Sequence, residues 1–375
     1  MHLRIVFDIA AVWRGGAERQ TLEVASRLSD LGHDVLLIVN KRAEHFAEYT
    51  DRVQIVELGR MNRWDARILC DLRRALRAFD PDVCACVMFN ASLWGRLAAA
   101  SVGCRVVVAE HSMTERTRLA EHLTNIALSP VTETVIACAG AQVDGVVRGG
   151  HQRRKVRVVR NGVDIERFCR DAAGATRVRD ELSVPADAAV LMLVAAHRPE
   201  KRHDRFVSLI ERLHAAGVQV YGVMVGGGPM LAHTRALADA SPVAEWLRVT
   251  GPVIDMPATY SAADVVVLLS DDIETFPLSF LEAQACEVPV AAMDTGGVRE
   301  TLIEGQSGFV VGQGDLQGMA SLVAAILADP ARRAELGRAG RRFVEEELSV
   351  GATVQGYLRI LEGSAGIPQG ARRGE

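Results

Sequence analysis

The feature that most constrains this chain is an alternation of short apolar segments with amphipathic helical patterns, which runs through the sequence twice. In the first half, we predict helices at 17–31, 65–79, 91–101, 116–128 and 140–148, and strands at 3–8, 35–39, 53–57, 83–88, 105–109, 134–138 and 156–160. Strands that alternate with helices form mostly parallel sheets covered on both faces. Because the pattern restarts at 190–196, the sequence predicts two Rossmann-like α/β domains in series.

The second run continues with strands at 219–225, 247–250 and 264–269, and with helices at 203–216, 229–240, 255–262, 315–328 and 330–362. A polar stretch at 171–188 separates the two runs, and we place the domain junction just before it, near Phe168. We therefore expect a first domain over 1–168 and a second over 169–345. Residues 346–362 are expected to form a C-terminal helix that packs back on the first domain. The polar tail at 363–375 is expected to be disordered.

Composition excludes several classes of protein. Aromatic residues make up only 5% of the chain, which disfavours a stacking surface for nucleic acid, and the net charge of −4 provides no general basic field. The seven cysteines show no metal-binding spacing and are interpreted as small buried residues in a reducing compartment. We find no signal-peptide pattern and no apolar run of the ~18 residues that span a membrane. We therefore expect a cytoplasmic protein.

The richest region chemically is Glu274–Gly297, which carries two carboxylates eight positions apart. A short loop with Glu274 precedes a predicted helix with Glu282, which Pro289 must end. The backbone N–H groups of Phe276, Pro277, Leu278 and Ser279 are therefore expected at a helix N-terminus, where a phosphate binds well. Carboxylates beside such a site make sense if they accept hydrogen bonds from hydroxyls on either side of a diphosphate. The region therefore predicts a site for a nucleotide sugar.

Two further segments provide groups for an anion. Gly15 and Gly16 follow the first strand and open a helix, which allows close backbone approach to a phosphate; a plain strand-to-helix turn is the alternative. Arg198 and Lys201 follow the first strand of the second domain, where cations can clamp a diphosphate. A solvated charged loop is the alternative there.

The Glu274–Gly297 region resembles the E-x7-E region of the retaining glycosyltransferases of family 4, which have the GT-B fold. Six more motifs of that family occur in order along about 300 residues: GGAERQTLEVASRL at 15–28, VVVAEH at 106–111, KVRVVRNGVDIERF at 155–168, RPEKRHD at 198–204, VMVGGGP at 223–229 and GQSGFVV at 305–311. Each motif alone is weak, but their order is not accidental.

The resemblance implies a fold of two Rossmann-like domains that face each other across a cleft. The second domain would bind a nucleoside-diphosphate sugar, with UDP the expected nucleotide, and the first would bind the acceptor and bring Gly15 and Gly16 to the diphosphate. The acceptor would be a hydroxyl of a glycan, a lipid-linked molecule or a small molecule. The nucleotide sugar is a co-substrate, and no cofactor is expected.

The resemblance also assigns roles to single residues. His111 matches the family histidine that contacts the transferred sugar, and Glu274 matches the glutamate that binds its hydroxyls; both are expected to be catalytic. Glu282 is expected to accept both ribose hydroxyls, because a carboxylate has two acceptor oxygens. Lys201 aligns with the family lysine that binds the diphosphate. Leu278, Ser279 and their neighbours are expected to contact the same diphosphate.

The chain departs from the family pattern at three positions. Ala196 replaces the arginine five residues before the lysine, so Arg198 or Arg202 must supply a guanidinium. Thr275 and Glu287 each replace a glycine, which puts the choice of donor sugar in doubt.

No metal is expected, because Ser270, Asp271 and Asp272 lack a further ligand cluster.

Two basic stretches remain, at 60–79 and 148–160. We favour a packing helix and a solvated loop, with peripheral docking on the anionic inner face of a membrane as the alternative. Two other functions stay open: a sugar-nucleotide epimerase on the same fold, and a non-catalytic relative that binds a nucleotide sugar.

Overall fold

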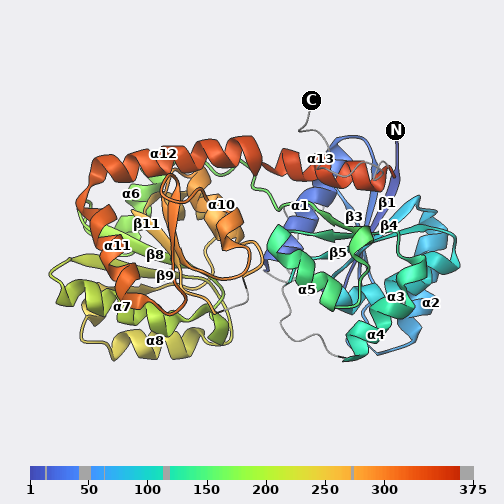
Figure 1. Cartoon of the computed structure of the whole chain (residues 1–375), viewed down its shortest axis with the longest axis horizontal. Coiled ribbons are helices and arrows are strands. Elements are labelled where there is room, and N and C mark those ends of the chain that lie inside the picture. The colour runs from blue at the N-terminus through green and yellow to red at the C-terminus, as the bar shows by residue number, and fades with distance from the viewer. Residues whose placement is uncertain (13–14, 42–51, 63, 113–118, 272–273, 364–375) are drawn as a thin grey trace. The chain divides into compact units, whose positions relative to one another are not determined.

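The computed structural model describes residues 1–12, 15–41, 52–62, 64–112, 119–271 and 274–363, which fall into two compact units. The first unit contains residues 1–161 together with the chain from Val350 onward, and the second contains residues 162–349. Figure 1 shows a parallel sheet with helices on its faces in each unit.

The first unit is built on a seven-stranded sheet in the order β3-β2-β1-β4-β5-β6-β7, with parallel pairing throughout. All seven predicted strands are present: β1 (Arg4–Ile9), β2 (Asp34–Val39), β3 (Gln54–Glu57), β4 (Val83–Val87), β5 (Arg105–Glu110), β6 (Thr134–Ala137) and β7 (Val156–Val158). Their alternating side chains supply two apolar cores, one on each face of the sheet.

One face of this sheet is covered by α1 (Gly16–Asp30) and by α13 (Val350–Leu361), the last helix of the chain. In Figure 1 the red α13 lies beside the blue α1. The other face is covered by α2 (Arg67–Phe79), α3 (Met88–Ser101) and α5 (Val143–Arg148), with α4 (Leu119–Ala127) at the periphery. The C-terminal helix is thus part of the first unit.

The central strand β1 carries a buried acid. Asp8 is fully buried, and neither of its carboxyl oxygens has a hydrogen-bond partner in the described part of the chain. Burial raises the pKa of Asp8 to about 8, against a smaller opposing effect of the Asn40 side chain. Gly95 on α3 packs directly on this carboxyl, since a Cβ at Gly95 would lie 2.2 Å from Asp8 Oδ2.

The second unit has a six-stranded parallel sheet in the order β10-β9-β8-β11-β12-β13. The strands are β8 (Ala189–Val194), β9 (Val220–Val225), β10 (Leu247–Val249), β11 (Val265–Leu268), β12 (Val290–Met293) and β13 (Gly308–Val311). Its helices are α6 (Ala172–Glu181), α7 (His203–Ala215), α8 (Leu231–Asp239), α9 (Met256–Ser261), α10 (Leu278–Ala285), α11 (Leu316–Ala328) and α12 (Pro330–Glu347). One apolar core joins the strands to α7 and α11.

The division between the units differs from the expected boundaries by a few residues. It falls after Asn161 because the segment that follows packs in the second unit: Val163 pairs with Ser349, and Arg341 Nη1 donates to the carbonyl oxygen of Phe168 at 2.7 Å. The second division falls after Ser349, where the helical pattern predicted as one segment breaks into α12 and α13.

Two predictions from composition need correction, and one falls outside the described residues. The polar stretch between the domains contains α6, because Asp171 caps this helix by accepting from the Gly174 N–H at 2.8 Å. Cys70 and Cys169 are exposed, although all the cysteines were interpreted as buried. The expected disorder of the tail concerns residues 364–375, which lie outside the described part of the chain.

Candidate active site

The second sheet gathers most of the predicted site residues at one edge. All its strands are parallel, so the loops that follow β8, β9 and β11 lie at the same, carboxyl end of the sheet, where open α/β sheets bind ligands. Lys201 comes from the loop after β8, Glu274 from the loop after β11, and Glu282 from α10.

Glu274 and Lys201 contact each other directly. Glu274 Oε1 accepts from Lys201 Nζ at 2.5 Å and from Ser270 Oγ at 2.6 Å, and the Glu274 side chain is only 8% exposed. Its carbonyl oxygen also accepts from the Gly297 N–H at 3.0 Å. The two residues predicted to bind the sugar and the diphosphate are therefore one ion pair, with Ser270 as a partner that the sequence did not predict.

Helix α10 begins close to this pair, but its start offers fewer donors than predicted. The helix runs from Leu278 to Ala285, and Pro277 is its N-cap residue. Proline has no N–H, so Pro277 cannot donate to a phosphate, and the prediction that all four residues at 276–279 donate was wrong. Leu278 and Ser279 lie in the first turn, where backbone N–H groups have no intrahelical acceptor.

Glu282 points into the protein and is already hydrogen-bonded. It is 3% exposed, and its Oε2 accepts from Tyr260 Oη at 2.7 Å. Tyr260 is itself fully buried on α9 and packs edge-on against Phe168. A ribose hydroxyl must therefore share this carboxylate with Tyr260, a residue that no sequence motif indicated.

The arginines near Lys201 in the sequence differ in whether they form ion pairs with carboxylates. Arg202 pairs with Asp204 at 2.7 Å and with Asp271 at 3.2 Å, and Asp271 also pairs with Arg205 at 2.9 Å. Arg198 is exposed and makes no ion pair with a carboxylate in the described residues. Of the two arginines considered as replacements at Ala196, Arg198 is thus the one that remains available to a ligand.

Two histidines that the sequence analysis missed hold the ends of the Lys201 loop together. The rings of His197 and His203 stack with centroids 4.1 Å apart, and His197 Nδ1 lies 3.0 Å from Thr234 Oγ1. Burial, and then the neighbouring His197, lower the pKa of His203 to about 3, so the pair is neutral at pH 7. A buried neutral pair fixes the loop without adding charge to the site.

In the first unit, Gly15 and Gly16 form the turn that was predicted. Gly15 is the N-cap of α1 and Gly16 its first residue. A Cβ at Gly15 would lie 2.1 Å from Glu18 Oε2, so glycine is needed for the Glu18 carboxylate to fold back over the start of the helix. An anion at this helix start would require the Glu18 side chain to turn away.

His111 follows β5, and its imidazole is held by the last helix of the chain. Its Nε2 lies 3.4 Å from Tyr357 Oη on α13, while Nδ1 has no hydrogen-bond partner in the described residues. Burial lowers the pKa of His111 to about 4, against a smaller opposing effect of Glu110. The imidazole is therefore neutral at pH 7. Tyr357 lies far from His111 in sequence, and nothing in the sequence indicated this contact.

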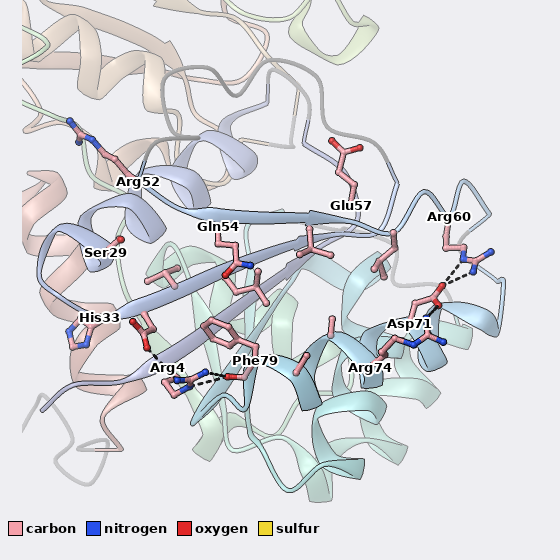
Figure 2. A pocket seen from close by; sticks show the side chains of 17 residues that line it. Arg4, Ser29, His33, Arg52, Gln54, Glu57, Arg60, Asp71, Arg74 and Phe79 are labelled. Carbon is pink, nitrogen blue, oxygen red and sulfur yellow. Dashed lines mark hydrogen bonds and ion pairs between the residues drawn. The ribbon is translucent and has the colours of Figure 1, made fainter.

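A pocket of about 990 Å³ lies elsewhere on the first unit, between the β2–β3 edge of the sheet and α2. Figure 2 shows Arg60 directed at Asp71, and Arg4 at the carbonyl oxygen of Phe79. The arginines that line this pocket are already paired with carboxylates or carbonyls, and none of the predicted site residues lines it. The chemistry at the carboxyl edges, rather than this pocket, therefore defines the candidate site.

Within the described ranges, no group of three or more histidine, cysteine, aspartate or glutamate side chains is arranged to hold a metal ion; Asp272 lies outside those ranges. No described helix has both the length and the apolar character needed to cross a membrane.

Two family models match successive parts of the chain. The model for glycosyltransferase family 4 matches residues 14–167, and the model for glycosyl transferases group 1 matches residues 175–343. The chain belongs to this glycosyltransferase family. Each match falls largely within one structural unit, in the order expected for the family.

Similar curated proteins are glycosyltransferases that match in part. A GDP-mannose-dependent alpha-(1-6)-phosphatidylinositol monomannoside mannosyltransferase of Mycolicibacterium smegmatis is 33% identical over 48% of this chain and 50% of its own length. A D-inositol 3-phosphate glycosyltransferase of Kineococcus radiotolerans is 34% identical over 56% of this chain and 52% of its own. The matches thus span about half the length of these relatives.

Similar solved structures extend over nearly the whole chain. Anabaena Alr3699/HepE in complex with UDP and glucose superposes with a TM-score of 0.85 over 96% of this chain and 100% of that one, at 18% identity. WaaG, a glycosyltransferase involved in lipopolysaccharide biosynthesis, superposes with a TM-score of 0.76 over 96% and 100%, at 14% identity. The chain therefore has the GT-B fold, as predicted.

Proposed function

We propose that the protein transfers a sugar from a nucleoside-diphosphate donor to a hydroxyl of an acceptor, with the donor bound at the carboxyl edge of the second sheet. The observation that carries this proposal is the ion pair between the half-buried Lys201 and the buried Glu274, close in sequence to the start of α10. A diphosphate matches the lysine and the helix N–H groups, while sugar hydroxyls match the carboxylate. A bound donor would thus contact Lys201 through its diphosphate and Glu274 through its sugar hydroxyls.

We assign a role to each unit from the groups that it carries. The second unit would bind the nucleotide through Lys201, the first turn of α10 and Glu282, with the exposed Arg198 as the guanidinium. The first unit would bind the acceptor and contribute His111 and the Gly15–Gly16 turn. This assignment of the nucleotide to the second unit and the acceptor to the first is tested by measuring nucleotide binding to variants with single substitutions in either unit.

We further propose a retaining reaction that requires no metal. In such a reaction the acceptor attacks from the face of the leaving group, and the departing phosphate takes its proton, so His111 is not needed as a base. A neutral imidazole can donate or accept a hydrogen bond and stabilise the reacting sugar. Helix N–H groups and cations would neutralise the leaving diphosphate in place of a metal.

For the nucleotide and the acceptor, we propose classes of molecule and not single compounds. UDP is the first choice from the family resemblance, and GDP is the second because mannosyltransferase relatives that match half of the chain are named for GDP-mannose. The acceptor would be a glycan, a lipid-linked molecule or a small molecule, with the reaction in the cytoplasm or at the inner face of a membrane.

Two other functions are separable from this one. An epimerase would interconvert nucleotide sugars with no acceptor, and a non-catalytic relative would bind the nucleotide without turnover. The paired Lys201 and Glu274, together with the half-buried His111, favour transfer because each matches a group expected to contact the donor.

The test is release of nucleoside diphosphate from a panel of UDP- and GDP-sugars, measured with and without an acceptor mixture and with and without EDTA. We expect acceptor-dependent release from one donor at a rate that EDTA leaves unchanged. Loss of the rate in EDTA, restored by Mg²⁺ or Mn²⁺, would contradict the metal-free reaction. Conversion of the donor sugar without nucleotide release would identify an epimerase.

A further inference from the structure

The last helix of the chain, α13, places a buried hydroxyl beside His111. Tyr357 on this helix is 3% exposed, and its Oη lies 3.4 Å from His111 Nε2. Within the described residues, this is the hydroxyl's one hydrogen-bond contact. A phenylalanine would fill the same apolar core, whereas a buried hydroxyl is costly unless it is hydrogen-bonded. The presence of the hydroxyl, and not only of the ring, therefore requires an explanation.

The part of α13 that carries Tyr357 is firmly attached to the first sheet. The Tyr357 ring packs against Phe7 of β1, with the ring centroids 6.5 Å apart. One turn further along the helix, Arg105 Nη1 donates to the carbonyl oxygen of Leu361 at 2.6 Å. Arg105 is the first residue of β5, the strand that His111 follows. The helix with the tyrosine and the strand before the histidine are therefore joined by a second, independent contact.

The backbone on either side of His111 is fixed by a buried amide. Gln142 is 1% exposed, and its Nε2 donates to the carbonyl oxygens of Glu110 and Ser112 at 3.1 and 3.0 Å. Its Oε1 accepts at 2.8 Å from the backbone N–H of the residue that follows β6. Because the backbone is held both before and after His111, the imidazole meets the Tyr357 hydroxyl from a fixed point.

Both partners of this contact are neutral at pH 7. Burial lowers the pKa of His111 to about 4, against a smaller opposing effect of Glu110. Burial also raises the pKa of Tyr357 above its ordinary value, with a smaller effect of Cys138 in the same direction. The contact therefore joins a hydroxyl that keeps its proton and an imidazole with one N–H and one acceptor nitrogen.

The direction of this hydrogen bond depends on which imidazole nitrogen carries the proton. If the Tyr357 hydroxyl donates to Nε2, the proton lies on Nδ1, and this N–H is the one group left without a partner in the described residues. If Nε2–H donates to the hydroxyl instead, the hydroxyl proton and the Nδ1 lone pair both lack partners there. Unpartnered buried polar groups are costly, so the first arrangement is favoured.

We propose that Tyr357 is a positioning residue that holds His111 in the tautomer with its proton on Nδ1, so that Nδ1–H donates to a hydroxyl oxygen of the transferred sugar. The contact with the sugar rests on the proposed function, whereas the tautomer is a property of the protein alone. The sugar would supply the partner that Nδ1 lacks in the described residues. Tyr357 acts through His111 and need not contact the sugar itself.

The first measurement is the tautomer of His111 at pH 7, from long-range ¹⁵N–¹H correlation spectra of the full chain labelled with ¹⁵N-histidine. The spectrum of His111→Gln identifies the signals of this ring among those of the ten histidines. We expect the Nδ1–H form in the unaltered chain and a shift toward the Nε2–H form in Tyr357→Phe. An Nε2–H form in the unaltered chain, or no change in Tyr357→Phe, would overturn the proposal.

The second measurement is steady-state kinetics with the nucleoside-diphosphate sugar that supports nucleotide release. Tyr357→Phe should lower kcat about three- to tenfold, as expected for one hydrogen bond, while the KM for the donor stays nearly unchanged. In the His111→Ala background the same substitution should have no further effect, because Tyr357 acts through His111. Equal losses in the two backgrounds, or an unchanged kcat in Tyr357→Phe alone, would show that Tyr357 does not position His111.

Thr353→Val is the matched control on the same helix. Thr353 lies one turn before Tyr357 and is also 3% exposed, and its Oγ1 donates to the carbonyl oxygen of Arg160 at 2.9 Å. The substitution removes a buried hydroxyl and a hydrogen bond that does not involve His111, so the tautomer and kcat should stay unchanged. Changes in Thr353→Val equal to those in Tyr357→Phe would assign both to the attachment of α13 and overturn the proposal. Circular dichroism checks that each variant folds, and the tautomer of the unaltered chain is a test that needs no variant of Tyr357.

The two measurements separate this proposal from the proposed function. The Nδ1–H tautomer in a chain that releases nucleotide from none of the donors would refute the proposed reaction and leave the assignment of the tautomer intact. Nucleotide release by a chain whose His111 carries its proton on Nε2 would refute the role of Tyr357 alone.

Discussion

The carboxyl edges of the two sheets differ in how they use charge. The edge of the second unit carries ion pairs in which Lys201 pairs with the buried Glu274 and Arg202 pairs with Asp271. The edge of the first unit presents a glycine turn and His111, whose imidazole is neutral at pH 7 because burial lowers its pKa to about 4. A charged and hydrogen-bonded edge suits a charged nucleotide, whereas the neutral imidazole of His111 suits sugar hydroxyls.

The ion pair in the second unit also indicates how the Lys201 and Glu274 side chains keep their positions when no ligand is bound. Removing two charges from water is costly unless they are paired, so Lys201 and Glu274 hold each other in place without a ligand. A donor that brings both a diphosphate and hydroxyls can replace each partner. A ligand with only one of these groups leaves the other member unpaired, which disfavours its binding.

The largest expected effect is that of Glu274→Gln. It removes the charge that faces Lys201 and the proposed sugar, and we expect turnover to fall by roughly 10²–10³. Ser270→Ala is the control, because it removes one hydrogen bond to the same oxygen and should cost about tenfold or less. Steady-state kinetics on the donor identified by nucleotide release would measure both. Turnover of Glu274→Gln close to that of the unaltered protein would remove this residue from the reaction.

The next effect concerns His111→Ala, which should lower turnover by roughly 10²-fold while nucleotide affinity stays nearly unchanged. Tyr357→Phe removes the group 3.4 Å from His111 Nε2 and should have a smaller effect of the same kind. Since the neutral imidazole is the active form, the rate should fall only as the pH drops toward about 4. A loss of rate centred near the ordinary histidine pKa, and absent from His111→Ala, would contradict this assignment.

Glu282→Ala should act on binding more than on turnover. A hydrogen bond to a charged acceptor contributes about 1.5–3 kcal/mol, so we expect nucleotide affinity to fall by roughly 10–100-fold. Tyr260→Phe controls for the partner of Glu282, since it keeps the carboxylate and removes the buried hydroxyl. Calorimetry with UDP and GDP measures each variant. Equal affinities of Glu282→Ala and the unaltered protein would place the ribose elsewhere.

The smallest effect is on stability and concerns the central strands of the two sheets. β1 contains the buried Asp8, whereas the corresponding strand β8 reads Ala-Val-Leu-Met-Leu-Val. The pKa of Asp8 is raised in the folded protein, so its contribution to stability is present at low pH and is lost as the pH rises from the ordinary aspartate value toward about 8. Asp8→Asn should therefore stabilise the first unit by roughly 1–3 kcal/mol at pH 8 and by less at pH 5. Thermal unfolding at both pH values tests this; an equal gain at both would show that Asp8 is ionised in the fold.

Much of the fold could be predicted because its signal is local. Each strand of the first sheet is a short apolar run between polar segments, and all seven occur where they were predicted. The capped helix α6 was missed because its residues are mostly polar and resemble a linker. The sequence analysis expected a separate C-terminal helix from residue 346 onward, and in the structure α12 ends at Glu347 and α13 begins at Val350.

For the candidate site, the sequence indicated single residues but not the contacts between them. Motif spacing identified Glu274, Glu282 and Lys201, and the structure adds the ion pair and the hydrogen bond from Tyr260. Tyr357 and Tyr260 lie far in sequence from the residues that they contact, and single tyrosines in apolar helices carry no functional signal. The hydrogen bond from the buried Arg96 to Asn125 on α4 is likewise a tertiary contact that no sequence motif indicated.

The most direct test of the account is hydrogen–deuterium exchange on the full chain with and without saturating nucleoside diphosphate. The account predicts slower exchange at Pro199–His203 and at the first turn of α10, because these segments would contact the diphosphate. Peptides from the β2–β3 edge of the first unit, which lines the 990 Å³ pocket, should not change. Protection at that edge with none at Pro199–His203 and α10 would contradict the central claim that the second unit binds the donor.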